Sequence, residues 1–138
     1  MMRRLVLCCL LLWAPLAAHA LTAAQAKAIA DGDSDERIAA LTAAAAEGAG
    51  GLGEFVQALL DEAVKVAGDK VLIVRDGKAV DAATGAPATL PDGAEDVVNN
   101  NRIRGALNAA RAALQIFSPD IAARRAGITE LQKESLEE

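Results

Sequence analysis

The sequence predicts a mainly α-helical fold, in which helical hairpins stack as at the start of an α-solenoid and one β-hairpin is inserted. Apolar residues recur at helical spacing in several segments, and capping residues precede most of those segments. The β-hairpin is predicted where the period changes to a short β-branched run, which is followed by Asp76 and Gly77.

The first two helices are predicted from their N-caps. Thr22 and Gln25 fit a capping box that opens a short helix ending near Gly32. Either Asp33 or Ser34 caps the second helix, and the acidic residues that follow suit the positive end of a helix dipole. A glycine-rich stretch ends this second helix.

The third helix and the hairpin follow each other directly. The apolar face of the helix has the spacing i, i+3, i+4, i+7 and i+8, in residues Val56, Leu59, Leu60, Ala63 and Val64. The β-hairpin insert is expected at about residues 70–83, and residues 84–93 have the composition of a loop. An isolated two-stranded hairpin is only marginally stable, so we expect it to pack against the helices.

Two further helices are predicted after this loop. The fourth is expected from Asp96 to Phe117. Ser118 as N-cap and Pro119 at the first helical position are expected to open the fifth, whose apolar face continues to Leu131.

A weak internal repeat favours a HEAT-like array. Residues 35–41 and 122–128 each open a helix after an aspartate turn, with an early arginine and small residues on one face. The first unit would span 33–67 and the second would begin at Ser118. Because a solenoid unit cannot bury its face alone, we expect the array to continue beyond residue 138. An unrelated alanine-rich bundle is the alternative.

The N-terminal 20 residues have the pattern of a secretory signal peptide. Arg3 and Arg4 precede an apolar run, and residues 18–20 form an A-x-A cleavage site. We therefore expect an exported domain over 21–138. Without Arg3 and Arg4, 12 of the 14 basic residues remain against 19 acidic ones, a net charge of −7.

Residues 21–138 contain neither His nor Cys. Most nucleophile–base pairs and zinc sites need these residue types, so we expect no enzyme and predict no catalytic, cofactor-binding or metal-ligating residue. Asp31, Asp33 and Asp35 resemble the start of a calcium loop, but Glu36 and Thr42 stand where the EF-hand pattern needs Gly and Glu. We interpret the aspartates as helix caps. The acidic balance and the scarcity of aromatic residues argue against nucleic-acid binding.

One polar cluster is a candidate site: Asn99, Asn100, Asn101, Arg102 and Arg104. The structural interpretation is that the asparagines satisfy backbone groups where the hairpin and its loop meet the fourth helix. Alanine at Asn100 or Asn101 would then destabilise the domain. The functional alternative is a contact surface for another subunit or a polar ligand.

Two motifs carry a family resemblance: Asp81 to Gly85 (D-A-A-T-G) and Asn100 to Arg104 (N-N-R-I-R). With the signal peptide and the order of the helices, they make the chain resemble the N-terminal periplasmic extension of the urea ABC transporter permease subunit, of the branched-chain amino acid permease-like family. The resemblance covers nearly the whole chain, although neither motif is catalytic. The family continues into transmembrane helices, which do not occur here after the signal peptide.

This resemblance implies the periplasmic domain of a bacterial inner-membrane protein, which serves urea import through subunit docking or assembly. The implied partners are a second permease, the ATPases and a periplasmic urea-binding protein, with membrane contact only through spans beyond this sequence. No transport residue of the family carries over. The alternative is a stand-alone secreted HEAT-like protein-binding module.

Overall fold

The computed structural model describes residues 20–136, so the predicted signal peptide lies almost wholly outside the described residues. Five helices are present: α1 Ala23–Ala30, α2 Ser34–Ala46, α3 Leu52–Leu60, α4 Asn101–Ile116 and α5 Ile121–Glu134. Five strands are present: β1 Val64–Ala67, β2 Lys70–Arg75, β3 Lys78–Asp81, β4 Pro87–Ala88 and β5 Glu95–Asp96. None of the helices over 20–136 combines the length and the apolar character needed to cross a membrane.

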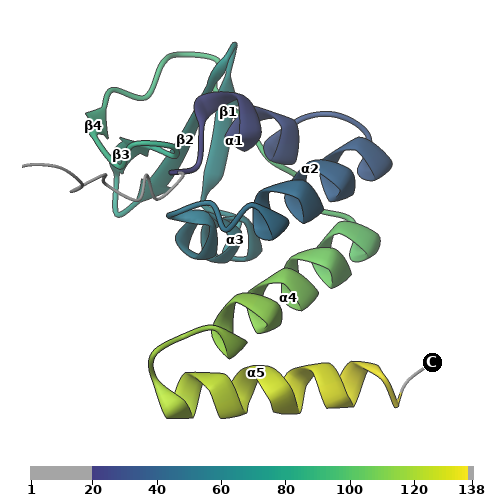
Figure 1. Cartoon of the computed structure of the whole chain (residues 1–138). Helices are drawn as coiled ribbons and strands as arrows, with labels where there is room; N and C mark the ends of the chain where they lie inside the picture. The colour runs from purple at the N-terminus through teal and green to yellow at the C-terminus, as the bar shows by residue number, and fades with distance from the viewer. Residues whose placement is uncertain (1–19, 137–138) are drawn as a thin grey trace, which may run out of the picture.

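The strands form one antiparallel sheet in the order β4-β3-β2-β1-β5, which overturns the predicted mainly α fold with a single inserted hairpin. Figure 1 shows α1, α2 and α3 gathered beside this sheet, with α4 leading away from them to α5. The predicted first HEAT-like unit, 33–67, contains α2 and α3 but ends in β1. The fold is therefore a mixture of helices and sheet rather than a stack of helix pairs.

The apolar spacing of the third helix predicts that it continues through Val64, but α3 ends at Leu60. Glu62 takes a left-handed conformation, with φ 57°, and ends the helix. The Glu62 N–H donates to the Leu59 carbonyl at 3.1 Å, and the Ala63 N–H donates to the Ala58 carbonyl at 2.9 Å. This is a Schellman-type end, which is usually marked by glycine. Because glutamate stands there instead, the residue type at this position does not mark the end of the helix.

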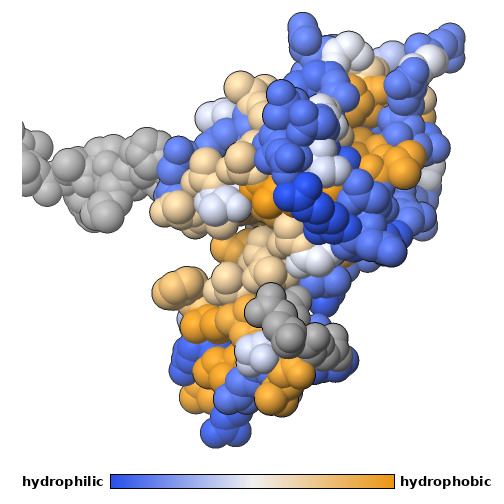
Figure 2. Space-filling view, turned by 90° about the vertical axis from the view of Figure 1, so that its right-hand side faces the viewer, coloured by the Kyte–Doolittle hydropathy of each residue, from blue (hydrophilic) through white to orange (hydrophobic). Residues whose placement is uncertain are grey.

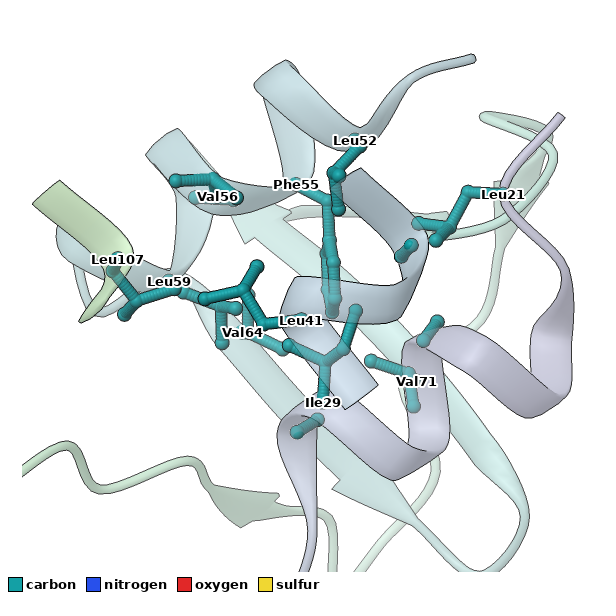
Figure 3. Close-up of a cluster of buried hydrophobic side chains, with 14 of the residues drawn as sticks. Leu21, Ile29, Leu41, Leu52, Phe55, Val56, Leu59, Val64, Val71 and Leu107 are labelled. Carbon is teal, nitrogen blue, oxygen red and sulfur yellow. The ribbon is translucent and has the colours of Figure 1, made fainter. Parts of the chain in front are cut away.

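The sheet is part of the core and not an insert. Val64 of β1 and Val71 of β2 are buried with the helical residues Ile29, Leu41 and Phe55 (Figure 3). The predicted strands near 70–83 do form β2 and β3, and Asp76 and Gly77 both have positive φ, as a type I′ turn requires. The missed partner is β1, which pairs with β2 from Val64↔Ile73 to Ala67↔Lys70.

Several helix ends agree with the capping residues. Thr22 and Gln25 form the expected capping box of α1, and Asp33 forms another with Glu36 at α2. The fourth helix, however, begins at Asn101 and not at Asp96, because residues 95–96 pair with β1 and the Val97 N–H donates to the Val64 carbonyl.

The fifth helix begins two residues later than predicted. Asp120 is its N-cap, and its carboxylate accepts from the Ala122 N–H at 2.9 Å. Ser118 instead accepts from the Asp120 N–H, so it shapes the turn before the helix.

Candidate functional site

The asparagine cluster lies at a junction where α2, α3 and α4 meet the end of the sheet. Its centre is Arg37 of α2, whose side chain is only 5% exposed. The Arg37 Nε donates to the Ile29 carbonyl at 2.7 Å, Nη1 donates to the Val98 carbonyl at 2.9 Å, and Nη2 donates to Asn99 Oδ1 at 2.6 Å. Asn99 in turn donates from Nδ2 to the Leu59 carbonyl at 2.9 Å. One guanidinium and one amide thus tie together the ends of α1 and α3 and the segment before α4.

Burial disfavours the charge that this junction holds. Loss of hydration lowers the pKa of the Arg37 guanidinium, and the negative charge of Asp31 partly opposes that effect. Neutral carbonyl and amide oxygens accept the three hydrogen bonds of Arg37. The side chain therefore depends on these acceptors for the solvation that it loses, and such an arrangement is typical of a structural arginine.

Asn100 and Asn101 have different environments. Asn100 is the N-cap of α4, where its Oδ1 accepts from the Ile103 N–H at 2.9 Å, and its Nδ2 donates to Ser34 Oγ at 2.8 Å. Asn101 is exposed, and its side chain makes no hydrogen bond within the described part of the chain. The structural role expected for all three asparagines therefore has support at Asn99 and Asn100 but not at Asn101.

Arg102 and Arg104 connect α4 to the elements before it. Arg102 forms an ion pair of 2.5 Å with Asp35 of α2, and Arg104 pairs with Glu62 at the end of α3. All four side chains are largely exposed, so each pair is worth only about 0–1 kcal/mol. They orient α4 rather than form a chemical centre.

Two of the three aspartates that we interpreted as helix caps do cap a helix, Asp31 and Asp33, whereas Asp35 lies in the first turn of α2. Asp33 caps α2, and Asp31 ends α1, where a hydrogen bond from Lys27 lowers the pKa of its carboxyl group. Over residues 20–136, no three potential metal-ligating side chains of His, Cys, Asp or Glu come together.

Sequence reasoning missed the central position of Arg37. It shares a helix face with Leu41 and Ala44, at the spacing i, i+4 and i+7, and both of these are buried. A charged residue on the buried face of an amphipathic helix was the available signal.

A second feature without a sequence signal is the exposed apolar surface of the α4–α5 hairpin. Figure 2 shows hydrophobic residues on the surface of the lower lobe, which α4 and α5 form in Figure 1. Phe117 is 86% exposed, Ile121 57% and Ile128 46%. We call these three residues the α5 apolar surface. Single exposed apolar residues are ordinary, but three on one helical hairpin make it a candidate contact surface.

The α5 apolar surface is held in place by close packing of α5 on α4. A Cβ built on Gly127 would lie 2.6 Å from the Ala112 carbonyl oxygen, so only glycine permits this approach. α4 is the main partner of α5, whereas α4 itself also packs on α2 and α3. The hairpin is therefore attached to the body, residues 20–100, mainly through α4.

In comparisons with known proteins, no family model, no curated protein and no solved structure matches the chain.

Proposed function

We propose that this chain is a docking domain in the periplasmic part of a urea ABC transporter permease subunit, and that it contacts another subunit through the α5 apolar surface. The assignment to urea import is supported by the signal-peptide pattern and by the two motifs at 81–85 and 100–104. The docking role is carried by one observation, the exposure of Phe117, Ile121 and Ile128 on a hairpin that packs on the body through one helix.

Both motifs that resemble the family contain a residue that stabilises the local structure of this fold. Asp81 Oδ1 accepts from the N–H groups of Ala83 and Thr84, at 2.9 Å each, and so shapes the turn after β3. Asn100 caps α4. Roles of this kind fit a domain that presents a surface better than a domain that catalyses a reaction.

The implied partners are a second permease, the ATPases and a periplasmic urea-binding protein. An exported domain reaches the binding protein and the periplasmic side of the permeases, whereas the ATPases bind on the other side of the membrane. We therefore expect direct contact with the first two and only indirect coupling to the ATPases.

A stand-alone secreted protein-binding module is the second candidate. The observation that favours it is the contiguous core of the body, which joins α1, α2, α3, the sheet and the start of α4. Such a core gives the described residues their own source of stability.

The test is to disrupt the α5 apolar surface in the bacterium that carries the chain. Ile121→Asp and Ile128→Asp place charges on exposed positions, so we expect little effect on folding, within about 0.5 kcal/mol. Urea uptake should fall severalfold, and permease or urea-binding subunits should no longer co-purify. The matched control is Leu90→Asp, which changes a 40% exposed leucine outside the hairpin.

The two candidates give different results in this experiment. Co-purification with transporter subunits that depends on Ile121 and Ile128 supports the docking domain. If deletion of the chain leaves urea uptake unchanged and no transporter subunit co-purifies, the urea assignment is wrong. A different exported protein that is lost with the same two variants then favours the secreted module.

A further inference from the structure

A groove lies where α3, the end of α4 and the start of α5 meet. It has a volume of about 280 Å³ and is lined by Gly53, Gln57, Arg111, Leu114, Gln115, Ser118 and Ala123. Leu114 and Ala123 contribute apolar surface, whereas the two glutamines, the serine and the arginine can donate hydrogen bonds. Pockets that hold drug-sized molecules begin near about 300 Å³, so this groove suits a small chemical group.

Arg111 is the cation of this groove, and its situation differs from that of the other arginines of α4. Arg102 and Arg104 pair with carboxylates, but Arg111 has no ion pair and no hydrogen bond with the side chains that the structure describes. It is partly buried, so it has lost some of its water. A guanidinium carries five N–H donors in a planar fork, and a carboxylate matches that fork with two parallel hydrogen bonds.

The surroundings of Arg111 favour an acceptor from outside the described chain. No Asp or Glu lines the groove, although residues 21–138 have a net charge of −7. Gln57 already donates to Asp61 at 2.8 Å, while the Gln115 amide and the Ser118 hydroxyl group remain as donors beside Arg111. One cation and two neutral donors match a ligand with a single negative charge better than they match a doubly charged phosphate.

We propose that this groove binds a carboxylate group, with Arg111 as its principal ligand and with Gln115 and Ser118 as additional donors. The carboxylate belongs either to a polypeptide, as a C-terminus or an acidic side chain, or to a free small acid. The proposal goes beyond the docking role and does not depend on it, because it can be tested with purified protein and small probes.

The first experiment follows the side-chain NMR signals of Arg111 Nε–Hε and of the Gln115 amide during titration with sodium acetate. Sodium chloride at equal ionic strength is the reference. A single partly exposed pair binds weakly, so we expect saturable shifts with a dissociation constant on the order of 10 mM. Sodium phosphate should shift these signals less than acetate.

The variants separate the groove from general charge effects. R111Q should abolish the saturable shift, and R111K, which keeps the charge but not the fork, should weaken binding severalfold. The matched control is R125Q, which removes an exposed arginine of α5 that does not line the groove, and it should bind acetate as the wild type does. Backbone amide signals of the body report whether each variant remains folded.

Three peptides of equal length distinguish the sources of the carboxylate. One has a free C-terminus, one is amidated, and one is amidated but contains glutamate. Tighter binding of the first or the third than of acetate identifies a C-terminal or side-chain carboxylate, and equal or weaker binding of all three identifies a free small acid. The proposal is overturned if acetate up to about 100 mM gives no saturable shift, if R111Q still binds, or if R125Q abolishes binding as well.

Discussion

The body and the α4–α5 hairpin differ most clearly in their phenylalanines, the only two aromatic residues described. Phe55 of α3 is fully buried and lies in the middle of the core (Figure 3), whereas Phe117 at the end of α4 is 86% exposed. The body buries most of its large apolar residues between helices and a sheet, with Leu90 and Val98 as exceptions, while the hairpin exposes Phe117, Ile121 and Ile128. Stability therefore resides mainly in the body, and the hairpin leaves more of its large apolar side chains exposed to solvent.

The largest effect should come from Phe55→Ala, which removes a side chain with 0% exposure. We expect a loss of about 3–5 kcal/mol in the free energy of unfolding, because the substitution removes buried area and leaves a cavity. Guanidinium denaturation measures this change. Phe117→Ala is the matched control and should change the same free energy by about 0.5 kcal/mol or less. Similar losses in both variants would contradict the distinction between body and hairpin.

The next effect concerns the arginines of the two regions. Arg37→Met keeps most of the apolar stem but leaves the Ile29 and Val98 carbonyls and the Asn99 amide without their donor. We expect a loss of about 2–4 kcal/mol on thermal or chemical unfolding, because buried polar groups without partners are costly. Arg125→Met, at an exposed position of α5, should stay within about 0.5 kcal/mol of the wild type. If Arg37→Met left the free energy of unfolding unchanged, water would have replaced the guanidinium group at the junction.

Gly127→Ala should loosen the hairpin and leave the body intact. Its Cβ would meet the Ala112 carbonyl at 2.6 Å, so α5 must shift away from α4, at a cost of about 1–3 kcal/mol. Amide hydrogen exchange should become faster in α5 while protection of β2 and α3 is unchanged. Gly105→Ala is the control in α4, where an added Cβ meets nothing within 4 Å, and it should stabilise α4 by about 0.5–1 kcal/mol.

The smallest effect distinguishes two neighbouring asparagines. Asn100→Ala removes the N-cap of α4 and the hydrogen bond to Ser34, so we expect a loss of about 1 kcal/mol. Asn101→Ala changes an exposed side chain at the first position of the helix and should be nearly neutral. Thermal unfolding of the two variants, measured side by side, decides the matter, and equal losses would show that Asn101 has a role that the hydrogen bonds do not reveal.

Sequence reasoning succeeded where a structure is encoded by neighbouring residues. The capping box at Thr22 and the turn at Asp76 and Gly77 are local, and both were predicted correctly. For the second helix the N-cap was narrowed to Asp33 or Ser34, and Asp33 is the cap. The end of α3 was missed because Glu62 adopts a conformation that usually belongs to glycine. Strands β4 and β5 have two residues each, which is too short for a period in the sequence to show them.

The candidate site was partly predictable for the same reason. Asparagines before a helix are a local capping signal, which pointed to Asn100. Arg37 lies 61 residues from Val98 and 62 from Asn99, so the hydrogen bonds between them follow from the tertiary fold alone. The exposure of Phe117 likewise depends on where α5 packs, which helical spacing alone does not determine.

The hydrogen bonds of Arg37 have a consequence for the order of folding. By joining α2 to Val98 and Asn99, they close a loop of the chain that contains the rest of α2, all of α3 and the whole five-stranded sheet. Closure of so long a loop costs entropy that is recovered only when the enclosed elements have packed, so we expect this junction to form after the transition state for folding. Weakening it should then accelerate unfolding and leave the folding rate almost unchanged. Arg37 would then stabilise the body only after it has folded. Its hydrogen bonds would affect the lifetime of the folded state more than they affect the rate of folding.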